Sequence, residues 1–265
     1  MDQTKVKKSG GFESMGLIPE LYRPIQGYNV PTPIQRKAIP QILAGCDIVA
    51  CSKTGSGKTA AFLIPLINKL QNHSTVVGIR GLILLPKRES ALQIASVLKV
   101  YGQFENLAAN PDILICTPGR ALQHLLEDRL KLSRVQMVIY DEADFLFEIG
   151  LADQLKQTLT HLPSQKHSLM FSATIPEQLS MFASVGLKDY IFCKLDKEFQ
   201  LPDKMQLHFL LAANDNKLSA LIYLISQLKD TCLIFASTRF LVDMLSQALN
   251  KFHISSVHVT VKWIN

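Results

Sequence analysis

The sequence has few cysteines, and its cysteines and histidines follow no pattern typical of a disulfide scaffold or a zinc site. Its five cysteines are odd in number and lie scattered along 265 residues without a Cys-x-x-Cys pair, and its seven histidines form no His-x-x-x-His pair. Because the cysteines lie mostly within apolar runs, we expect reduced thiols in the core of an intracellular protein. We predict no zinc site.

Long hydrophobic runs are also missing. No run approaches the ~18 apolar residues of a membrane span, and the N-terminal residues lack the apolar segment of a secretion signal. We therefore expect a soluble protein that is not secreted and has no membrane partner. Lys5, Lys7 and Lys8 most simply form a solvated tail, with nuclear targeting or RNA contact as the alternative.

The composition is that of a globular protein. Hydrophobic residues make up 48% of the chain and charged residues 19%, and 265 residues can bury a core in one large domain or two smaller ones. The net charge of +6 is compatible with a polyanionic partner but does not require one.

The most informative stretch covers residues 47–59. A short β-rich run leads into a Gly-x-Gly-Lys-Thr turn and then an apolar helical pattern, so that backbone N–H groups and a helix N-terminus converge on a phosphate. We predict a nucleoside triphosphate site, with Lys58 on the β and γ oxygens and the Thr59 hydroxyl on Mg²⁺. The alternative is a loop whose small residues only separate strand from helix. The residues predicted to bind the nucleotide here are Thr54, Gly55, Ser56, Gly57, Lys58 and Thr59.

Strand-like and helix-like runs alternate along the chain. Predicted strands cover residues 47–51, 81–85, 113–116, 137–140, 168–172 and 191–194. Predicted helices cover residues 58–70, 89–101, 120–127, 151–159 and 176–185, after a helix that begins at Thr32 or Pro33 and ends at Leu43. Continuous apolar strands separated by helices predict an α/β fold, a parallel sheet with helices on both faces. Functional residues should then lie at the carboxyl ends of the strands.

We divide the chain into four parts. Residues 1–26 form an N-terminal tail and short helix, 27–194 the first domain, 195–204 a polar linker and 205–265 a second unit. Three strands and two helices make less than half of a doubly wound domain, so we expect the second unit to be incomplete. Its predicted strands are 205–211, 231–235 and 254–258, and its predicted helices are 216–227 and 238–252.

An acidic motif follows the apolar run at residues 137–140. Asp141-Glu142-Ala143-Asp144 stands at the end of a predicted buried strand. We expect Asp141 to hold Mg²⁺, partly through water, and Glu142 to face the hydrolytic water. We also expect the strand before Asp141 and the strand before the phosphate loop to be neighbours in one sheet. The alternative is a helix N-terminus that favours acidic residues for its own stability.

The motifs together resemble those of the DEAD-box RNA helicases. Beside the literal Asp-Glu-Ala-Asp, residues 27–35 (Gly-Tyr-Asn-Val-Pro-Thr-Pro-Ile-Gln) are similar to the adenine-reading Q motif of that family. The matches follow the order of the family over most of the chain. Residues 11–17 and 144–150 resemble the nucleolar subfamily of large ribosomal subunit assembly. Further matching segments are 86–89, 117–120, 172–174 and 233–239.

The resemblance implies two RecA-like units, the second truncated, that bind ATP, Mg²⁺ and RNA and remodel RNA through ATP hydrolysis. It implies that Gln35 reads the adenine edge and that Phe12 stacks on the ring, although Phe12 lies about two residues nearer to the Q motif than in the family. Ser172 and Thr174 would link the state of the nucleotide to domain closure, and their alternative role is to cap a following helix.

The resemblance also assigns an RNA surface. The residues that it places on the sugar-phosphate backbone, without base preference, are Arg88, Thr117, Gly119 and Arg120. The implied RNA is a ribosomal precursor, with ribonucleoprotein partners compatible with that role. The implied location is the nucleus, specifically the nucleolus, and we expect a monomer.

The chain departs from the family pattern at four places. Lys87 and Ser90 replace the threonine and leucine of Pro-Thr-Arg-Glu-Leu-Ala, and Ser52 stands where the phosphate loop usually has glycine. The interval 101–111 is shorter than the dozen residues or so that a parallel crossover needs, so we expect an internal deletion that leaves one strand fewer or an exposed gap. The arginine-rich C-terminal motif of the family is absent, and such an arginine is worth about 10³ to 10⁵ in rate.

These departures leave more than one hypothesis for the function. For the chain alone we expect weak Mg-ATP binding and little RNA-stimulated hydrolysis. A catalytically impaired ATP- and RNA-binding module is the first alternative, because the arginine motif is missing. An ATPase with an unrelated phosphate loop is the second, and Gln35 with the Asp-Glu-Ala-Asp motif argues against it.

Overall fold

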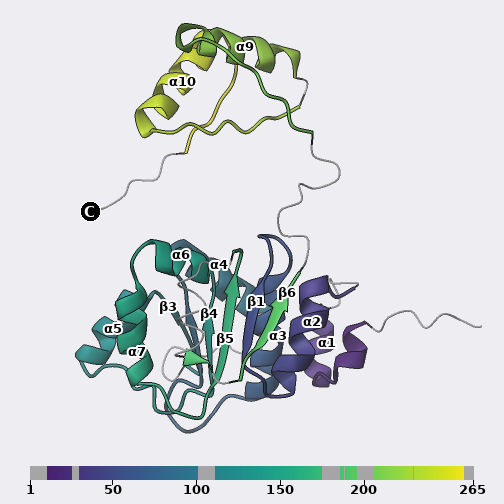
Figure 1. Cartoon of the computed structure of the whole chain (residues 1–265), viewed down its shortest axis with the longest axis vertical. Coiled ribbons are helices and arrows are strands. Elements are labelled where there is room, and N and C mark those ends of the chain that lie inside the picture. Colours follow the sequence, from purple (N-terminus) through teal and green to yellow (C-terminus); the bar gives the residue numbers. More distant parts are fainter. Residues whose placement is uncertain are drawn as a thin grey trace, which may run out of the picture. The chain divides into compact units, whose positions relative to one another are not determined.

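The computed structural model describes residues 11–25, 30–100, 111–174, 186–187, 189–195, 206–228 and 230–259. It divides the chain into two units, Met1–Gln200 and Leu201–Asn265, which are described separately (Figure 1). The predicted helix at 176–185, all but the first residue of the predicted linker at 195–204, and the short interval at 101–110 lie outside the described residues.

The first unit is built on a six-stranded sheet in the order β3-β2-β4-β5-β1-β6, and all neighbouring strands run parallel. This confirms the predicted parallel α/β fold. The prediction that the strands before the phosphate loop and before Asp141 are neighbours was wrong. These strands are β1 and β4, and β5 lies between them and pairs with both. The strands are β1 (Ile48–Cys51), β2 (Gly81–Leu84), β3 (Ile113–Cys116), β4 (Met137–Tyr140), β5 (His167–Ser172) and β6 (Ile191–Lys194).

Helices cover both faces of this sheet (Figure 1). Along β4, Met137 and Ile139 belong to one hydrophobic cluster while Val138 and Tyr140 belong to the other, as expected for a strand buried on both sides. The first cluster includes residues of the 3₁₀ helix η1 (Phe12–Met15), α1 (Pro19–Ile25), α2 (Pro33–Leu43), α3 (Lys58–Leu70) and α4 (Arg88–Val100); the second includes α5 (Pro118–Leu126), α6 (Ala143–Glu148) and α7 (Ala152–Thr160).

The helix α6 was not predicted. It has six residues, less than two turns, so its apolar side chains are too few to establish a helical period in the sequence. It begins directly after Glu142, and this places the acidic motif at the junction between β4 and a helix.

The second unit contains the predicted helices but not the predicted strands. Its elements are a 3₁₀ turn η2 (Asn214–Asn216), α9 (Lys217–Gln227) and α10 (Arg239–Lys251), whereas residues 206–211, 231–235 and 254–258 carry no strand. Phe209, Leu211 and Phe235 in these segments are exposed. Strands need neighbours to pair their N–H and C=O groups, and among the described residues of this unit the extended segments form no such ladder.

The cysteines only partly match the expectation of core thiols. All five are free, and Cys51 and Cys193 are buried, but Cys232 in the second unit is exposed because the segment around it is not packed. None of the helices that the structure describes is long and apolar enough to cross a membrane.

Candidate active site

A cleft of about 610 Å³ lies where β1, β2, β4 and β5 end. Parallel strands deliver their carboxyl ends to one edge, so residues far apart in the sequence meet there. The lining includes Thr54, Gly55, Gly57, Lys58 and Thr59 after β1, Lys87 and Ser90 after β2, Asp141, Glu142 and Asp144 after β4, and Ala173 after β5. The structure therefore brings the predicted phosphate loop and the acidic motif together.

The phosphate loop depends on two glycines with left-handed backbones. Gly55 has φ of 77° and Gly57 has φ of 92°. A Cβ atom on Gly57 would lie 2.5 Å from Nε2 of Gln35 and 3.0 Å from Oγ1 of Thr32, so only glycine fits this position. Gly57 is also the N-cap of α3 and supplies no side-chain cap. The first N–H groups of α3 are thus left for an anion.

Ser52 fits the loop although the usual residue there is glycine. Its side chain is buried, and its backbone is not among those with positive φ in the described residues. Its Oγ lies 2.8 Å from Oγ of Ser56, and its N–H donates to the carbonyl of Ser172 at 3.1 Å, which continues the pairing of β1 with β5. The serine therefore introduces no backbone strain.

Lys58 enters the cleft from the first turn of α3. Its Nζ donates a hydrogen bond to the carbonyl of Ser52, and it makes no ion pair with a described residue. Burial lowers the pKa of Lys58, and the nearby carboxylate of Asp141 opposes this effect. A partly desolvated ammonium without a direct counter-ion is well suited to a phosphate.

Asp141 is a buried carboxylate with few partners. Its side chain is 7% exposed, and its Oδ1 accepts a hydrogen bond from the N–H of Glu142 at 3.0 Å. Burial raises the pKa of Asp141 to about 6, although that hydrogen bond and the Lys58 charge act in the opposite direction. The carboxylate is therefore short of positive charge, which is typical of a position that binds a cation or a proton.

Glu142 lies beside Asp141 and has a left-handed backbone, with φ of 51° and ψ of 44°. Such a conformation is uncommon for a residue other than glycine and points to a functional constraint. Oε1 of Glu142 accepts a hydrogen bond from Oγ of Ser90 at 2.8 Å. The structure thus directs the carboxylate of Glu142 toward α4, along the wall of the cleft.

Asp144 joins the acidic motif to the end of β5. Its Oδ2 accepts hydrogen bonds from the N–H of Ala173 at 3.2 Å, from the N–H of Thr174 at 3.0 Å and from the hydroxyl of Thr174 at 3.1 Å. The N–H of Asp144 donates to Oγ of Ser172 at 3.2 Å. The predicted coupling residues are therefore in direct contact with the acidic motif.

The structure places Gln35 against the phosphate loop. The side chain is buried: its Oε1 accepts from the N–H of Thr32 at 2.9 Å, and its Nε2 donates to the carbonyl of Gly57 at 3.1 Å. Thr32 and Gln35 form the capping box that starts α2. Phe12 is buried in the hydrophobic cluster on the α2 and α3 side, and it does not line the cleft. Their adenine-binding roles stay predictions.

The predicted RNA residues lie at the same edge of the sheet but outside the cleft. Arg88 begins α4 after β2, and Thr117, Gly119 and Arg120 begin α5 after β3, so pairing of β2 with β3 brings the two groups to adjacent strand ends. Arg88 and Arg120 are exposed, and Arg120 donates to Oε1 of Gln123 at 2.6 Å. Their contact with RNA stays a prediction.

The residues in the cleft fit a magnesium ion. The Thr59 hydroxyl and the Asp141 carboxylate line the same cleft and offer the oxygen ligands that Mg²⁺ prefers. Among the described residues, the carboxylate of Asp141 accepts one hydrogen bond, at Oδ1, which leaves Oδ2 for a cation. Within the described ranges no group of three or more histidines, cysteines and carboxylates could hold a metal alone.

Two residues of the cleft were missed as site residues. Ser90 contacts Glu142, and Nζ of Lys87 lies 4.2 Å from the ring centroid of Phe145. The sequence did single out both positions, as replacements in the family pattern, but it gave no partner for either. The available signal was the replacement of threonine by a charged residue just before a helix and of leucine by a polar residue in its first turn.

Comparison with protein families and curated proteins gives one consistent result. A family model described as DEAD/DEAH box helicase matches residues 32–182. The DEAD-box ATP-dependent RNA helicase 29 of Oryza sativa subsp. indica is 45% identical, over 91% of this chain and 31% of its own length. The ATP-dependent RNA helicase DDX54 of Mus musculus is 41% identical, over 96% and 32%. The chain spans about a third of the length of these relatives.

Solved structures with the same fold are also found. The crystal structure of a DEAD box protein from the hyperthermophile Methanococcus jannaschii is similar with a TM-score of 0.64 and 29% identity, covering 91% of this chain and 70% of that chain. The structure of S. cerevisiae Dbp5 bound to RNA and ADP BeF3 has a TM-score of 0.79 at 24% identity, covering 93% and 68%. At that identity the second likeness shows the fold alone.

Proposed function

Because the chain belongs to the DEAD/DEAH box helicase family, we propose that it binds ATP with Mg²⁺ and couples ATP hydrolysis to the remodelling of RNA. Membership of the family confirms the resemblance of the sequence motifs. One observation carries the proposal: Lys58, Thr59, Asp141 and Glu142 line a single cleft of about 610 Å³ at the carboxyl edge of the sheet.

Four residues of the cleft have a chemical role in this proposal. The uncapped N-terminus of α3 and the Lys58 ammonium bind the β and γ phosphates. Thr59 and Asp141 hold the metal, which neutralises charge on the phosphate oxygens when bound. Glu142 orients the attacking water and accepts its proton.

Coupling to RNA requires a path from the phosphates to the RNA surface. Asp144 is bonded to Thr174 and Ser172, so a change at the acidic motif reaches the end of β5 directly. Arg88 and Arg120 lie on helices that begin at the same edge of the sheet. Contacts from these helix starts to the sugar-phosphate backbone would bind RNA without base preference.

The RNA and the location come from the subfamily. The relatives named DDX54 and dbp10, at 41% to 46% identity, support the subfamily resemblance of residues 11–17 and 144–150. We therefore propose ribosomal precursor RNA as the partner and the nucleolus as the location.

A second candidate function is an ATP- and RNA-binding module with impaired catalysis. This hypothesis concerns the 265 residues by themselves, which hold no His-Arg-x-Gly-Arg-x-x-Arg motif and span about a third of the length of the relatives. An arginine that stabilises the transition state accounts for about 10³ to 10⁵ in rate, more than any single residue of the first unit could replace.

The deciding experiment measures ATP binding and ATP turnover, with and without RNA, for the wild type, Lys58→Ala and Lys53→Ala. Lys53 lies in the same loop but is exposed and does not line the cleft, so it is the matched control. We expect Lys58→Ala to abolish RNA-stimulated turnover and Lys53→Ala to retain it.

The other outcomes separate the hypotheses. Lys58-dependent binding without turnover would favour the impaired module, while turnover that survives Lys58→Ala would contradict the site. Equal use of GTP and ATP would contradict the role of Gln35 in reading adenine.

A further inference from the structure

We propose that Ser90 is a positioning residue for ATP hydrolysis, which acts by holding the carboxylate of Glu142. The inference rests on the proposed function, in which Glu142 faces the attacking water. Its direct observation is the hydrogen bond from Oγ of Ser90 to Oε1 of Glu142 at 2.8 Å, which joins α4 to the acidic motif across the cleft.

Glu142 needs an external partner to fix its orientation. It stands half-buried at the N-cap of α6 with no capping hydrogen bond from its own side chain. Three rotatable bonds separate its carboxylate from the backbone, so without a partner the group would sample several rotamers. The Ser90 hydroxyl occupies one oxygen of the carboxylate and leaves Oε2 for water. This is the arrangement that a positioned general base requires.

The fold places Ser90 rigidly for this role. Ser90 lies in the first turn of α4, one turn before Ile94, and the two residues share a face of the helix. Ile94 is buried in the core, and both residues line the cleft. The hydroxyl is therefore carried by a helix that is anchored to the sheet rather than by a loop.

A second contact joins the same two segments. Nζ of Lys87, the residue before α4, lies 4.2 Å from the ring centroid of Phe145 in α6. The attraction between a cation and an aromatic face is modest where the cation is exposed, and Lys87 is exposed. Glu142 and Phe145 are one turn apart, so the start of α6 is held at two points by the start of α4.

The test compares steady-state ATP hydrolysis by the full chain carrying Ser90→Ala, Ser90→Thr or Ser96→Ala. Ser96 lies on the same helix, is exposed, and donates only to the carbonyl of Gln93, so it is a matched control. We expect Ser90→Ala to lower kcat about tenfold, as loss of one hydrogen bond to a charged group predicts, with KM for ATP within about twofold of wild type. Ser90→Thr, which keeps the hydroxyl, should restore most of kcat.

A double-mutant cycle with Glu142→Gln shows whether Ser90 acts through Glu142. In the Glu142→Gln background Ser90→Ala should change residual turnover by less than about twofold, because the group that Ser90 positions has lost its function. An equal loss in both backgrounds would overturn the inference. So would an increase in kcat on removing the hydroxyl, because the contact would then hold Glu142 away from water.

The test also separates this inference from the proposed function. Turnover that depends on Lys58 but is the same in Ser90→Ala and Ser96→Ala overturns the role of Ser90 and leaves the proposed function intact. Absence of any Lys58-dependent turnover in the wild type overturns the proposed hydrolysis, and with it the role of Ser90.

Discussion

Asp112 and Asp141 are both buried aspartates, and they stand at opposite ends of the same parallel sheet. Asp112 directly precedes β3 at the amino edge and is 1% exposed, while Asp141 directly follows β4 at the carboxyl edge and is 7% exposed. Their chemical state differs, because the pKa of Asp112 is lowered and the pKa of Asp141 is raised to about 6.

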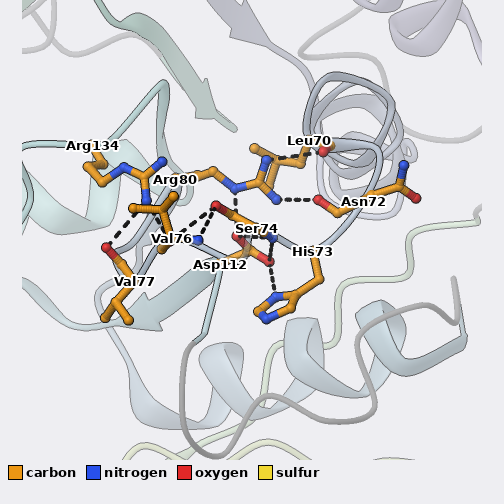
Figure 2. Close-up of polar contacts among 9 residues, drawn as sticks. All are labelled: Leu70, Asn72, His73, Ser74, Val76, Val77, Arg80, Asp112 and Arg134. Carbon is orange, nitrogen blue, oxygen red and sulfur yellow. Dashed lines mark hydrogen bonds and ion pairs between the residues drawn. The ribbon is translucent and has the colours of Figure 1, made fainter.

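Both carboxylate oxygens of Asp112 have hydrogen-bond partners. Its Oδ1 accepts a hydrogen bond from Nε of Arg80 at 2.5 Å, and its Oδ2 lies 2.5 Å from Nδ1 of His73. The N–H of Ser74 lies within 3.4 Å of both carboxylate oxygens. Figure 2 shows how these residues surround Asp112. Arg80 in turn donates to the carbonyls of Leu70 and Asn72. Burial alone would raise the pKa of Asp112, but the hydrogen bonds from Arg80 and His73 outweigh it.

The environment of Asp141 is incomplete by comparison. Within the described part of the chain it accepts one hydrogen bond, from the backbone of Glu142, and makes no ion pair. A buried charge is unfavourable unless it is paired, so the folded chain holds Asp141 in a state that a cation would stabilise. The comparison shows that the buried aspartate at the amino edge has partners on both carboxylate oxygens, whereas the one at the carboxyl edge, where we propose the functional site, has a single hydrogen bond.

The largest expected effect on the free energy of unfolding is that of substituting Asp112, at the amino edge of the sheet. Asp112→Asn leaves the Arg80 guanidinium buried without its counter-charge, and breaking a buried pair in this way costs about 3–5 kcal/mol in the free energy of unfolding. Chemical denaturation followed by circular dichroism measures it. The exposed Asp153→Asn, in the first turn of α7, is the control and should change stability by no more than about 1 kcal/mol. A cost below about 1 kcal/mol for Asp112→Asn would mean that the network contributes little.

At Asp141, at the carboxyl edge of the sheet, the same substitution should raise the free energy of unfolding instead of lowering it. Asp141→Asn removes a carboxylate whose pKa is raised from 3.8 to about 6, so it should stabilise the free protein by roughly 1–3 kcal/mol at pH 7.5. The proposed site predicts that Mg²⁺ and ATP raise the melting temperature of the wild type, and Asp141→Asn should abolish that rise. Destabilisation by Asp141→Asn would break the comparison, because it would show that the carboxylate is a structural partner.

The pH dependence of the two variants should separate them further. Because the pKa of Asp141 is higher in the folded chain than in the unfolded chain, its ionisation penalises folding progressively from pH 3.8 to about 6. The gain from Asp141→Asn should therefore fall by about half between pH 7.5 and pH 5, and to about a fifth near pH 4. Asp112 has a lowered pKa, so its stabilising effect is present above pH 3.8 and lost only below that value.

Denaturation of the wild type and both variants at pH 7.5, 5 and 4 checks this prediction. A gain from Asp141→Asn that stays constant down to pH 4 would contradict the raised pKa.

The sequence was informative where the signal is local. The strands were predictable because each is a continuous apolar run, and the start of α2 because Thr32 and Gln35 form a capping box within four residues. The strand order was not, since the place of β5 between β4 and β1 depends on how the crossovers pack. In the second unit the apolar segments indicated strands, but apolar character alone does not supply the neighbouring strands that a ladder needs.

The two ends of the sheet also differed in predictability. The meeting of the phosphate loop with the acidic motif at the carboxyl edge was predictable, because both motifs have recognisable spacing. The pair of Arg80 with Asp112 and the pair of Ser90 with Glu142 were not found, because each joins residues more than thirty positions apart that only the fold brings together. Ordinary surface residues and network residues look alike in a sequence.

The smallest expected effect concerns His73, the more exposed of the two side chains paired with Asp112. Its side chain is 47% exposed, so its contact with Asp112 is screened by water and should be worth no more than about 1 kcal/mol. In His73→Ala, Asp112 keeps Arg80 and the N–H of Ser74, so the carboxylate stays paired. We expect the unfolding free energy at pH 7.5 to fall by less than about 1 kcal/mol, several times less than for Asp112→Asn. If His73→Ala and Asp112→Asn lowered the unfolding free energy equally, Arg80 alone would not stabilise the buried charge of Asp112. Asp112 would then have no more effective partners than Asp141.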